Sequence, residues 1–380
     1  MGERLAGQDA PGWQLRRAVA PVLRPVRIPP RGRLRTGARP CRGEDPCCRC
    51  SWAAWRSSGQ PVKAALKSAD KVQLQLRWVP QAQFAGYYAA SAKGLYAAEK
   101  LDVTIRPGGP DGVPEEIVVG GGAQFGIGWL PSLLAARDRG AALVNIAQVF
   151  AYSGTREIAL KSSGIKSPAD LRGRRVAVWF GGSEFELFAT LEKYKIDRNR
   201  DVILVPQPYD MNLFLQKKVD AAAAMTYNEY KQVLDAGVKP EDLVVIDFNQ
   251  EGTSMLQDGI FVRADWIRDA KNKAIAARFL RASLKGWEHC RDKPAECLEI
   301  VLKETKGRGR EHQGWMLAEV SKLVWGPPAP RSPLGKMDPE AFKRTADIAY
   351  RFGVIKKTAD SAAYTHEIWE MAQKKPARSP

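Results

Sequence analysis

The chain has 380 residues, a formal net charge of +17 and a composition of 44% hydrophobic and 27% charged residues. This length and composition predict a globular protein with two domains, because single hydrophobic cores stop growing at shorter lengths. The charge would favour nucleic acid as a partner, but residues 1–70 hold fourteen Lys or Arg against five Asp or Glu, a net of +9. The excess is therefore concentrated at one end and argues against nucleic-acid binding, and no apolar run reaches the length of a membrane span.

The segment 1–68 is basic, rich in Pro and Arg, and has no periodic apolar pattern. Such a segment cannot bury a core, so we expect it to be disordered. Four of the six cysteines fall in it (Cys41, Cys47, Cys48, Cys50), but no second CxxC pair or histidine cluster accompanies them, and we predict no metal site. No secretory signal is legible. We interpret the segment as a mis-set start or an unusual leader, and retention of Met1 in native material would contradict this.

Regular structure is predicted from Lys71, where apolar and polar residues alternate up to Trp78 as in a half-buried strand. The first run of elements then alternates strands at 101–106, 123–127, 143–148 and 156–161 with helices at 86–99, 114–119 and 130–139. A second run has strands at 175–179, 202–205, 219–225 and 243–247, with helices at 183–194, 211–217 and 227–235. This alternation predicts α/β sheets with helices on both faces.

A strand at 259–263 is expected to return to the first sheet, and the remainder of the chain is helical. The predicted helices span 265–292, 294–304, 311–324, 338–352 and 361–372, before a frayed tail at 374–380. Cys290 and Cys297 fall seven residues apart on apparently helical sequence, and we interpret them as two small core residues rather than a disulfide.

The stretch from Trp179 to Glu186 joins a strand to a helix and has the features of a ligand-binding turn. Two glycines allow a ligand to approach the backbone, and Ser183 with Glu186 has the spacing of a capping box. The helix start would present unpaired N–H groups to ligand oxygens. The alternative is a turn whose glycines are only steric and whose Glu186 only caps the helix.

Aromatic residues recur where predicted strands end or the next helix begins. They are Trp78, Phe84, Tyr87, Tyr88, Trp129, Trp179, Phe180, Tyr209 and Tyr227. In open α/β sheets ligands bind beyond the strand ends, so two such lobes would enclose an aromatic cleft. Polar residues in the same loops would orient the ligand: Gln81, Gln83, Glu184, Glu186, Asp210, Asn212, Asn228 and Asp258. For each aromatic residue a place in the core stays the alternative.

Four stretches carry a family resemblance: LRWVPQAQFAGYYAASAKGLYAAEKLDVTI, GGAQFGIGWLPSLLAARDRG, GIKSPADLRGRRVAVWFGGSEFE and DAAAAMTYNEY. They resemble the substrate-binding proteins of ABC importers for sulfonates, thiamine precursors and riboflavin, over about residues 71–325. The resemblance implies an α/β, two-lobed periplasmic-binding-protein fold of type II with a helical C-terminal region. The expected boundaries are 69–162 plus 259–373 for lobe 1 and 163–258 for lobe 2.

Within that family, WVPQAQFAGYY together with WFGGSEFE resembles the riboflavin-binding members most. The superfamily also includes the pyrimidine synthase of fungal thiamine biosynthesis. Where that enzyme carries a cofactor-binding lysine and a sacrificial histidine, this sequence has Gly128 and Ser132, and its cysteine-rich motif is matched by 254–258 without cysteine. An aldimine needs a lysine amine, so we expect no enzymatic activity and no cofactor.

The resulting expectation is a monomeric receptor that binds riboflavin and delivers it to an ABC permease and its ATPase. The alternatives are a receptor for a thiamine-pyrimidine precursor and, in another class, the thiamine pyrimidine synthase itself. The resemblance implies a periplasmic or otherwise extracytoplasmic location. The predicted ligand-binding residues are Trp78, Gln83, Phe84, Tyr87, Trp129, Trp179, Phe180, Gly181, Gly182, Ser183, Glu184, Tyr209, Asn212, Tyr227 and Asp258.

Overall fold

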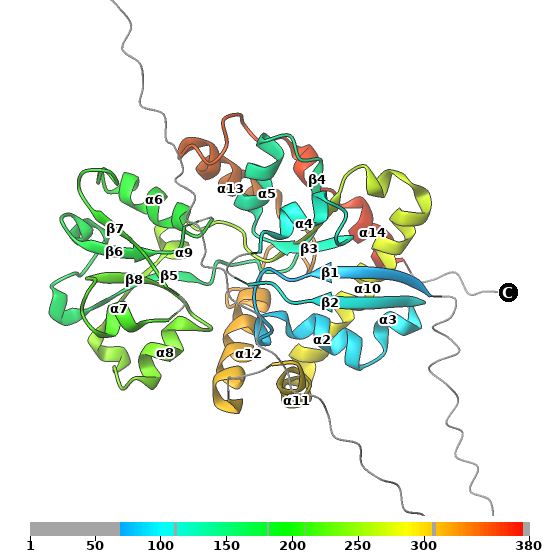
Figure 1. Ribbon diagram of the computed structural model, residues 1–380, viewed down its shortest axis with the longest axis horizontal. Coiled ribbons are helices and arrows are strands. Elements are labelled where there is room, and N and C mark those ends of the chain that lie inside the picture. Colours follow the sequence, from blue (N-terminus) through cyan, green and yellow to red (C-terminus); the bar gives the residue numbers. More distant parts are fainter. Residues whose placement is uncertain (1–68, 110–111, 181, 209, 306–308, 375–380) are drawn as a thin grey trace, which may run out of the picture. The chain divides into compact units, whose positions relative to one another are not determined.

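The computed structural model describes residues 69–109, 112–180, 182–208, 210–305 and 309–374. In these residues the chain builds two five-stranded sheets with helices packed on them (Figure 1). The basic segment 1–68, with its four cysteines, and residues 375–380 of the predicted tail lie outside the described residues.

The first sheet has the strand order β2-β1-β3-β10-β4. Its strands are β1 (Asp70–Gln75), β2 (Leu101–Arg106), β3 (Phe125–Gly128), β4 (Leu143–Gln148) and β10 (Gly259–Arg263). Strand β10 runs antiparallel to both neighbours, whereas β1 is parallel to β2 and β3. Every residue of β3 and β4 is buried. Strand β3 is central and covered on both faces, whereas β4 is an edge strand whose Asn145 and Gln148 form bridges with Tyr364 and Gly335 of the C-terminal region. The sheet and its helices are called the first lobe below.

The connections of the first lobe carry η2 (Ala82–Phe84), α2 (Ala85–Ala92), α3 (Leu95–Ala98), α4 (Pro114–Val119) and α5 (Leu130–Asp138). Proline stands in the first turn of both α4 and α5, where its missing N–H costs no helical hydrogen bond. The single helix predicted over 86–99 is divided at Gly94, whose φ of 68° is left-handed, a conformation that glycine adopts without strain.

The second sheet repeats this arrangement with the order β7-β6-β8-β5-β9. Its strands are β5 (Thr155–Leu160), β6 (Arg175–Val178), β7 (Ile203–Pro206), β8 (Ala221–Met225) and β9 (Leu243–Asp247), and its helical segments are η3 (Lys161–Ser163), η4 (Pro168–Leu171), α6 (Glu184–Lys193), α7 (Asn212–Leu215), α8 (Glu229–Asp235), η5 (Pro240–Asp242) and α9 (Phe248–Glu251). Here β5 is the strand that runs antiparallel to both neighbours. This sheet with its helices is called the second lobe.

The chain crosses between the sheets twice, at residues 149–154 after β4 and at residues 248–258 before β10. In each sheet the parallel strands, β1 and β3 in the first and β6 and β8 in the second, have their carboxyl ends at the same end of the sheet. Loops lead from these carboxyl ends into helices. The predicted α/β fold with two sheets and a returning strand at 259–263 is confirmed. In Figure 1 the labelled strands β1 to β4, coloured blue to blue-green, belong to the first sheet, and the labelled green strands β5 to β8 belong to the second.

The rest of the described chain is helical, as predicted: η6 (Trp266–Arg268), α10 (Ala270–Asp292), α11 (Pro294–Glu304), α12 (Arg310–Trp325), α13 (Pro339–Arg351), η7 (Ser361–Ala363) and α14 (Glu367–Gln373). Helix α10 packs closely on α2. A Cβ atom on Gly286 would lie 2.0 Å from the carbonyl oxygen of Gly86, so this contact requires glycine. Among the described helices, none is both long enough and apolar enough to cross a membrane.

The interpretation of Cys290 and Cys297 as two unpaired core residues is wrong, because they form a disulfide. On one continuous helix, residues seven apart would be separated by roughly 10 Å along the axis. The helical conformation is interrupted at Lys293, between α10 and α11. Because of this interruption, the Cα atoms of Cys290 and Cys297 lie 5.0 Å apart. The bond therefore joins the end of α10 to the start of α11.

Candidate functional site

A cavity of about 660 Å³ is lined by loops from both lobes, at the ends of their parallel strands. The first lobe contributes Arg77, Trp78, Gln81, Gln83, Pro114, Glu115, Trp129 and Ser132, and the second contributes Trp179, Phe180, Gly182, Ser183, Gln207, Tyr227, Asn228 and Glu229, among others. Its volume is in the range of small-molecule sites, and its position is the one at which open α/β sheets bind ligands. We call this cavity the main cleft.

On the first lobe, a chain of buried hydrogen bonds supports the cleft wall. The indole N–H of Trp129 donates to Asp258 Oδ1 at 2.9 Å, and Gln83 Nε2 donates to Asp258 Oδ2 at 2.8 Å. Gln83 Oε1 in turn accepts from Gln81 Nε2 at 2.7 Å. Burial raises the pKa of Asp258 to about 6, although these hydrogen bonds and the charge of Arg77 oppose the shift. Asp258 thus orients side chains that line the cleft.

Asp258 also has a backbone φ of 44°, in the left-handed region that residues other than glycine rarely adopt. Outliers of this kind persist only where the surrounding structure holds them. Here the two side-chain bonds from Gln83 and Trp129 hold the residue, at the end of the second crossing between the lobes.

Charged side chains of the first lobe flank the same wall. The guanidinium of Arg77 lies over the Trp129 ring, 4.1 Å from its centroid, a favourable arrangement for a cation and an aromatic face. Glu115, in the first turn of α4, is buried, and burial raises its pKa although the charges of Arg77 and Arg139 oppose this. A side chain at Gly128 would place its Cβ 2.7 Å from Glu115 Oε1, so the wall requires glycine there.

On the second lobe, the cleft wall is the glycine turn before α6. Gly182 has a φ of 131°, and a Cβ on it would lie 2.7 Å from Ser132 Oγ of the first lobe. Its N–H donates to Glu184 Oε2 at 2.7 Å. The Trp179 side chain is half-buried and donates from Nε1 to the carbonyl oxygen of Pro208, whereas Phe180 is 52% exposed. This turn brings backbone close to the opposite lobe, as the glycines of the sequence suggested.

The capping-box interpretation of this turn is wrong. Ser183 occupies the N-cap position of α6 but makes no side-chain capping bond. Glu186 Oε1 instead accepts from the Met255 N–H at 2.6 Å, and Glu186 Oε2 accepts from Ser153 Oγ at 3.0 Å. Because residues 153 and 255 belong to the two crossing segments, Glu186 joins both of them to α6. Its burial raises its pKa to about 7.

The structure brings eight of the predicted ligand-binding residues to the lining of the main cleft: Trp78, Gln83, Trp129, Trp179, Phe180, Gly182, Ser183 and Tyr227. Four others are buried outside this lining: Phe84, Tyr87, Glu184 and Asp258. Asn212 is exposed at the start of α7 and does not line the cleft. Gly181 and Tyr209 lie outside the described residues. Ligand contact by any of them stays a prediction.

Tyr87 illustrates the core alternative. Its ring packs edge-on against Trp287, 5.7 Å between centroids, and it is 1% exposed. Phe84 is fully buried beside it in the same core. Both aromatics follow the strand end as predicted, but Tyr87 belongs to α2, which packs on α10, and Phe84 belongs to η2, which packs on α12.

The sequence analysis did not select several residues that line the cleft, among them Arg77, Glu115, Ser132 and Gln207. Two of them follow the same strand-end rule that selected the aromatics. Glu115 lies in the first turn of the helix after β2, and Gln207 comes directly after β7. Applying the rule to polar residues after every strand would have found both.

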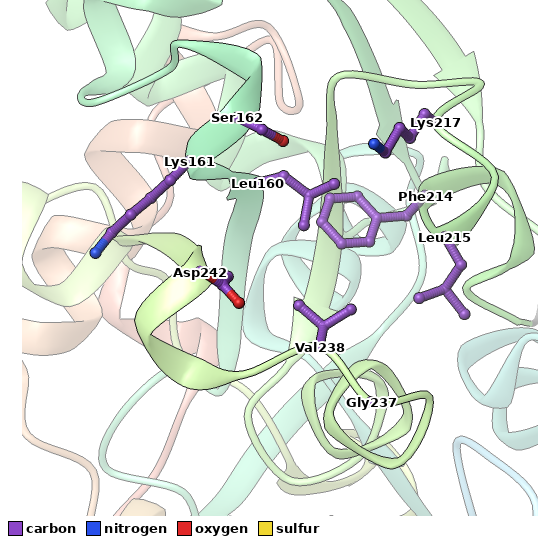
Figure 2. Close-up of a pocket in the computed structure, with 9 residues that line it drawn as sticks. All are labelled: Leu160, Lys161, Ser162, Phe214, Leu215, Lys217, Gly237, Val238 and Asp242. Carbon is purple, nitrogen blue, oxygen red and sulfur yellow. The ribbon is translucent and has the colours of Figure 1, made fainter.

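A second cavity, of about 380 Å³, lies at the end of the second sheet opposite to the carboxyl ends of its parallel strands (Figure 2). It is lined by Leu160 at the end of the antiparallel strand β5, by Phe214 and by Val238, with Lys161, Lys217 and Asp242 beside them. It shares no lining residue with the main cleft. Because ligands of open α/β sheets bind beyond the carboxyl ends of parallel strands, the main cleft is the candidate site.

No group of three or more His, Cys, Asp or Glu side chains in the described part of the chain is arranged to hold a metal ion. The polar groups around the main cleft are amides, hydroxyls, carboxylates and guanidinium groups, among aromatic rings. This combination suits a planar organic ligand, because rings supply burial and a few polar groups supply orientation.

Comparison with known proteins gives a family and a set of relatives. The model of the NMT1/THI5-like family matches residues 81–297. The riboflavin-binding protein RibY of Chloroflexus aurantiacus is 26% identical over 317 residues, which cover 81% of this chain and 88% of that protein. The 4-amino-5-hydroxymethyl-2-methylpyrimidine phosphate synthase of Legionella pneumophila is 27% identical over 259 residues, 63% of this chain and 74% of the synthase.

Among solved structures, the periplasmic aliphatic sulphonate-binding protein SsuA of Escherichia coli has a TM-score of 0.58 and 18% identity. The similarity covers 82% of this chain and 94% of SsuA. At this identity the similarity establishes the fold, and it confirms the predicted two-lobed periplasmic-binding-protein architecture.

Proposed function

The chain belongs to the NMT1/THI5-like family, and from that premise we propose that it is a non-enzymatic substrate-binding protein of an ABC importer. Its ligand is a flat heteroaromatic vitamin, with riboflavin favoured. The observation that carries the proposal is the convergence of Trp78 and Trp129 from one lobe with Trp179 and Phe180 from the other on a single cavity. Aromatic rings on both sides of a cavity favour a planar ligand, because they bury it by stacking.

Similarity to the riboflavin-binding protein RibY, over 81% of this chain, supports riboflavin over other heteroaromatic ligands. We propose that the ring system lies between the aromatic side chains of the two lobes. Ligand contacts to both lobes would then stabilise a closed arrangement, as in hinge-type binding proteins. The boundaries proposed for this movement follow the two crossings: 69–148 plus 259–373 for one lobe and 155–247 for the other, because β5 belongs to the second sheet and not to the first.

The synthase alternative is disfavoured by a specific observation at Gly128. Resemblance to the fungal enzyme aligns its cofactor-binding lysine with this residue and its sacrificial histidine with Ser132. A side chain at 128 would collide with Glu115 Oε1 and with the Phe261 ring, which lie 2.7 and 2.8 Å from the position of its Cβ. The wall is thus fitted to glycine, and the chain supplies no amine there for an aldimine.

A receptor for a thiamine-pyrimidine precursor is the second candidate. It is supported by a formylaminopyrimidine-binding protein of Halalkalibacterium halodurans, 23% identical over 62% of this chain. The two candidates share the binding mode and differ in ring size, so direct titration with each ligand separates them.

The proposed partners are the permease and ATPase of the importer, with the protein acting as a monomer in an extracytoplasmic compartment. The disulfide between Cys290 and Cys297 supports that location, because disulfides persist in oxidising compartments and are rare in the cytosol.

Titration of riboflavin with the purified chain, followed by quenching of flavin fluorescence, tests the proposal. Saturable quenching at equimolar ratio is expected, since indole rings stacked on the flavin quench its emission. A parallel titration with 4-amino-5-hydroxymethyl-2-methylpyrimidine by calorimetry serves as the comparison. Absence of flavin binding up to high micromolar concentration, with binding of the pyrimidine, would replace riboflavin by the second candidate; pyrimidine formation by the chain with pyridoxal phosphate would overturn the receptor function.

A further inference from the structure

Four buried polar atoms that belong to residues lining the main cleft have no hydrogen-bond partner among the described residues. They are Gln81 Oε1, Glu115 Oε1, Ser132 Oγ and Gln207 Oε1. Buried polar atoms in native proteins are nearly always paired with protein groups or water. Fourteen side-chain atoms of the described residues are buried without a partner, and these four belong to residues that line one cavity, where a bound ligand would serve as their partner. Three of the four atoms are hydrogen-bond acceptors.

The orientation of the Gln81 amide is determined by its neighbours. Trp129 Nε1 can only donate, and the Asp258 carboxylate accepts from it and from Gln83 Nε2. Gln83 must therefore turn its oxygen toward Gln81, whose Nε2 donates to it. Gln81 Oε1 remains as the atom without a partner. The amide thus has an acceptor left over, and turning it over would place two amide oxygens, which can only accept, against each other.

Gln207 is fixed in the same sense from the second lobe. Its Nε2 donates to the carbonyl oxygen of Ala223 at 2.7 Å, and a carbonyl oxygen can only accept. Its Oε1 is buried without a partner. The second lobe therefore also has a buried acceptor in a residue that lines the main cleft.

Three carboxyl groups line the main cleft: Glu115, Glu116 and Glu229. Glu116 is exposed, and Glu229 accepts from the Met225 N–H and from Asn228 Nδ2. Glu115 is therefore the buried carboxyl group of the lining that we assign to a ligand N–H. Glu115 is 2% exposed, lines the cleft, and has a buried Oε1 without a partner.

We propose that the main cleft selects its ligand by hydrogen-bond donors: Gln81 and Glu115 of the first lobe and Gln207 of the second accept from N–H or O–H groups of the bound heteroaromatic molecule. The inference rests on the proposed function and specifies its chemistry. In a flavin the donors are the imide N–H and the hydroxyl groups of the side chain; in an aminopyrimidine they are the exocyclic amine and the hydroxymethyl group. A molecule of the same shape with its N–H groups methylated leaves the acceptors unpaired and is rejected.

The test compares matched ligand pairs by calorimetry with the full chain: riboflavin against N3-methylriboflavin, and 4-amino-5-hydroxymethyl-2-methylpyrimidine against its N,N-dimethyl analogue. For whichever parent ligand binds, we expect at least tenfold weaker binding of the methylated partner. The variants Glu115→Met, Gln81→Met and Gln207→Met keep the side-chain size and remove the acceptor. In at least one of them the discrimination should fall below threefold. The control is Glu241→Gln, at an exposed position of η5, which should keep the discrimination of the wild type.

A structural role for these acceptors gives a different result. If Glu115 Oε1 served the fold, Glu115→Met would unfold at lower urea concentration than the wild type; if it serves the ligand, the free variant is as stable as the wild type or more so, because an unpaired buried acceptor has been removed. Gln81→Met and Gln207→Met also remove the Nε2 donors of Gln83 Oε1 and the Ala223 carbonyl oxygen, so these two variants are compared by ligand discrimination and not by stability. Equal binding of parent and methylated riboflavin, or discrimination that survives in all three variants, would overturn the inference and leave the flavin function standing. If the chain binds the aminopyrimidine but not its N,N-dimethyl analogue and does not bind riboflavin, the flavin ligand is wrong and the inference about hydrogen-bond donors is supported. If neither riboflavin nor the aminopyrimidine binds, the proposed function and the inference are both wrong.

Discussion

On the first lobe, the cleft wall is buried and joined by hydrogen bonds: Trp129 is 4% exposed, and Asp258 accepts from both Trp129 and Gln83. On the second lobe the facing turn rests on Gly182 in a left-handed conformation and presents Phe180 with 52% exposure. A wall whose side chains are already fixed loses little entropy when a ligand binds, whereas an exposed ring gains burial only in the complex. From this difference we propose that the first lobe forms the docking surface and the second closes over it.

The strongest test of this comparison is removal of the central side chain of the first wall. Trp129→Ala should lower the free energy of unfolding by about 3–5 kcal/mol, because it opens a cavity and leaves Asp258 with one partner fewer. Riboflavin affinity should fall about 100-fold. Urea denaturation and fluorescence titration measure the two effects. The control is Trp129→Phe, which keeps a ring but has no N–H, and we expect it to lose only about 1–2 kcal/mol in the free energy of unfolding. If Trp129→Ala bound riboflavin with wild-type affinity, the first wall would not be the docking surface.

The connection between the lobes should respond to pH through Glu186. Burial raises its pKa from 4.5 to about 7, so the folded state binds this proton more tightly than the unfolded chain does. The stabilisation is complete below pH 4.5 and is lost as the pH rises toward 7, with a contribution on the order of 3 kcal/mol. Asp258, raised to about 6, acts in the same direction. Denaturation midpoints from pH 5 to 8 should fall in the wild type and change less in Glu186→Gln; equal slopes would contradict the assignment.

A change outside both walls should separate stability from binding. The double variant Cys290→Ser with Cys297→Ser removes the disulfide between α10 and α11. We expect a loss of about 2 kcal/mol in the free energy of unfolding, because the bond restricts a short loop of the unfolded chain. Riboflavin affinity should stay within a factor of two. Thermal melts with and without reductant are the measurement, and a wild-type melt unaffected by reductant would speak against this contribution.

The smallest effect is expected at the second wall. Phe180→Ala should leave stability within about 0.5 kcal/mol, because its ring is half exposed in the free protein. Riboflavin affinity should fall by roughly 3- to 10-fold, since closure would bury the ring over the ligand. Val119→Ala is the control, at an exposed apolar residue that does not line the cleft. A loss of affinity in Phe180→Ala as large as that in Trp129→Ala would remove the distinction between the walls.

Much of the fold followed from patterns of neighbouring residues. The alternation that begins at Lys71 and the apolar runs of β4 and β8 predicted strands close to their observed bounds. The aromatics after β1, β3 and β6 pointed to one edge of each sheet, and the main cleft lies there. The same rule included Phe84 and Tyr87, which are buried in the core on the side of α12 and α10, because position in the chain does not tell which side of a loop faces a neighbouring helix.

The sequence by itself determined the elements, the two-sheet architecture and the family, because periodicity and short motifs are properties of consecutive residues. Only the tertiary structure decided which polar atoms meet. Asp258 orients Gln83 and Trp129, distant in the chain, and Glu186 binds Met255 and Ser153 of the crossings instead of capping its own helix. Cys290 and Cys297 pair because the helix breaks between them. These contacts depend on strand order and on the two crossings, which set distances between residues that no local pattern records.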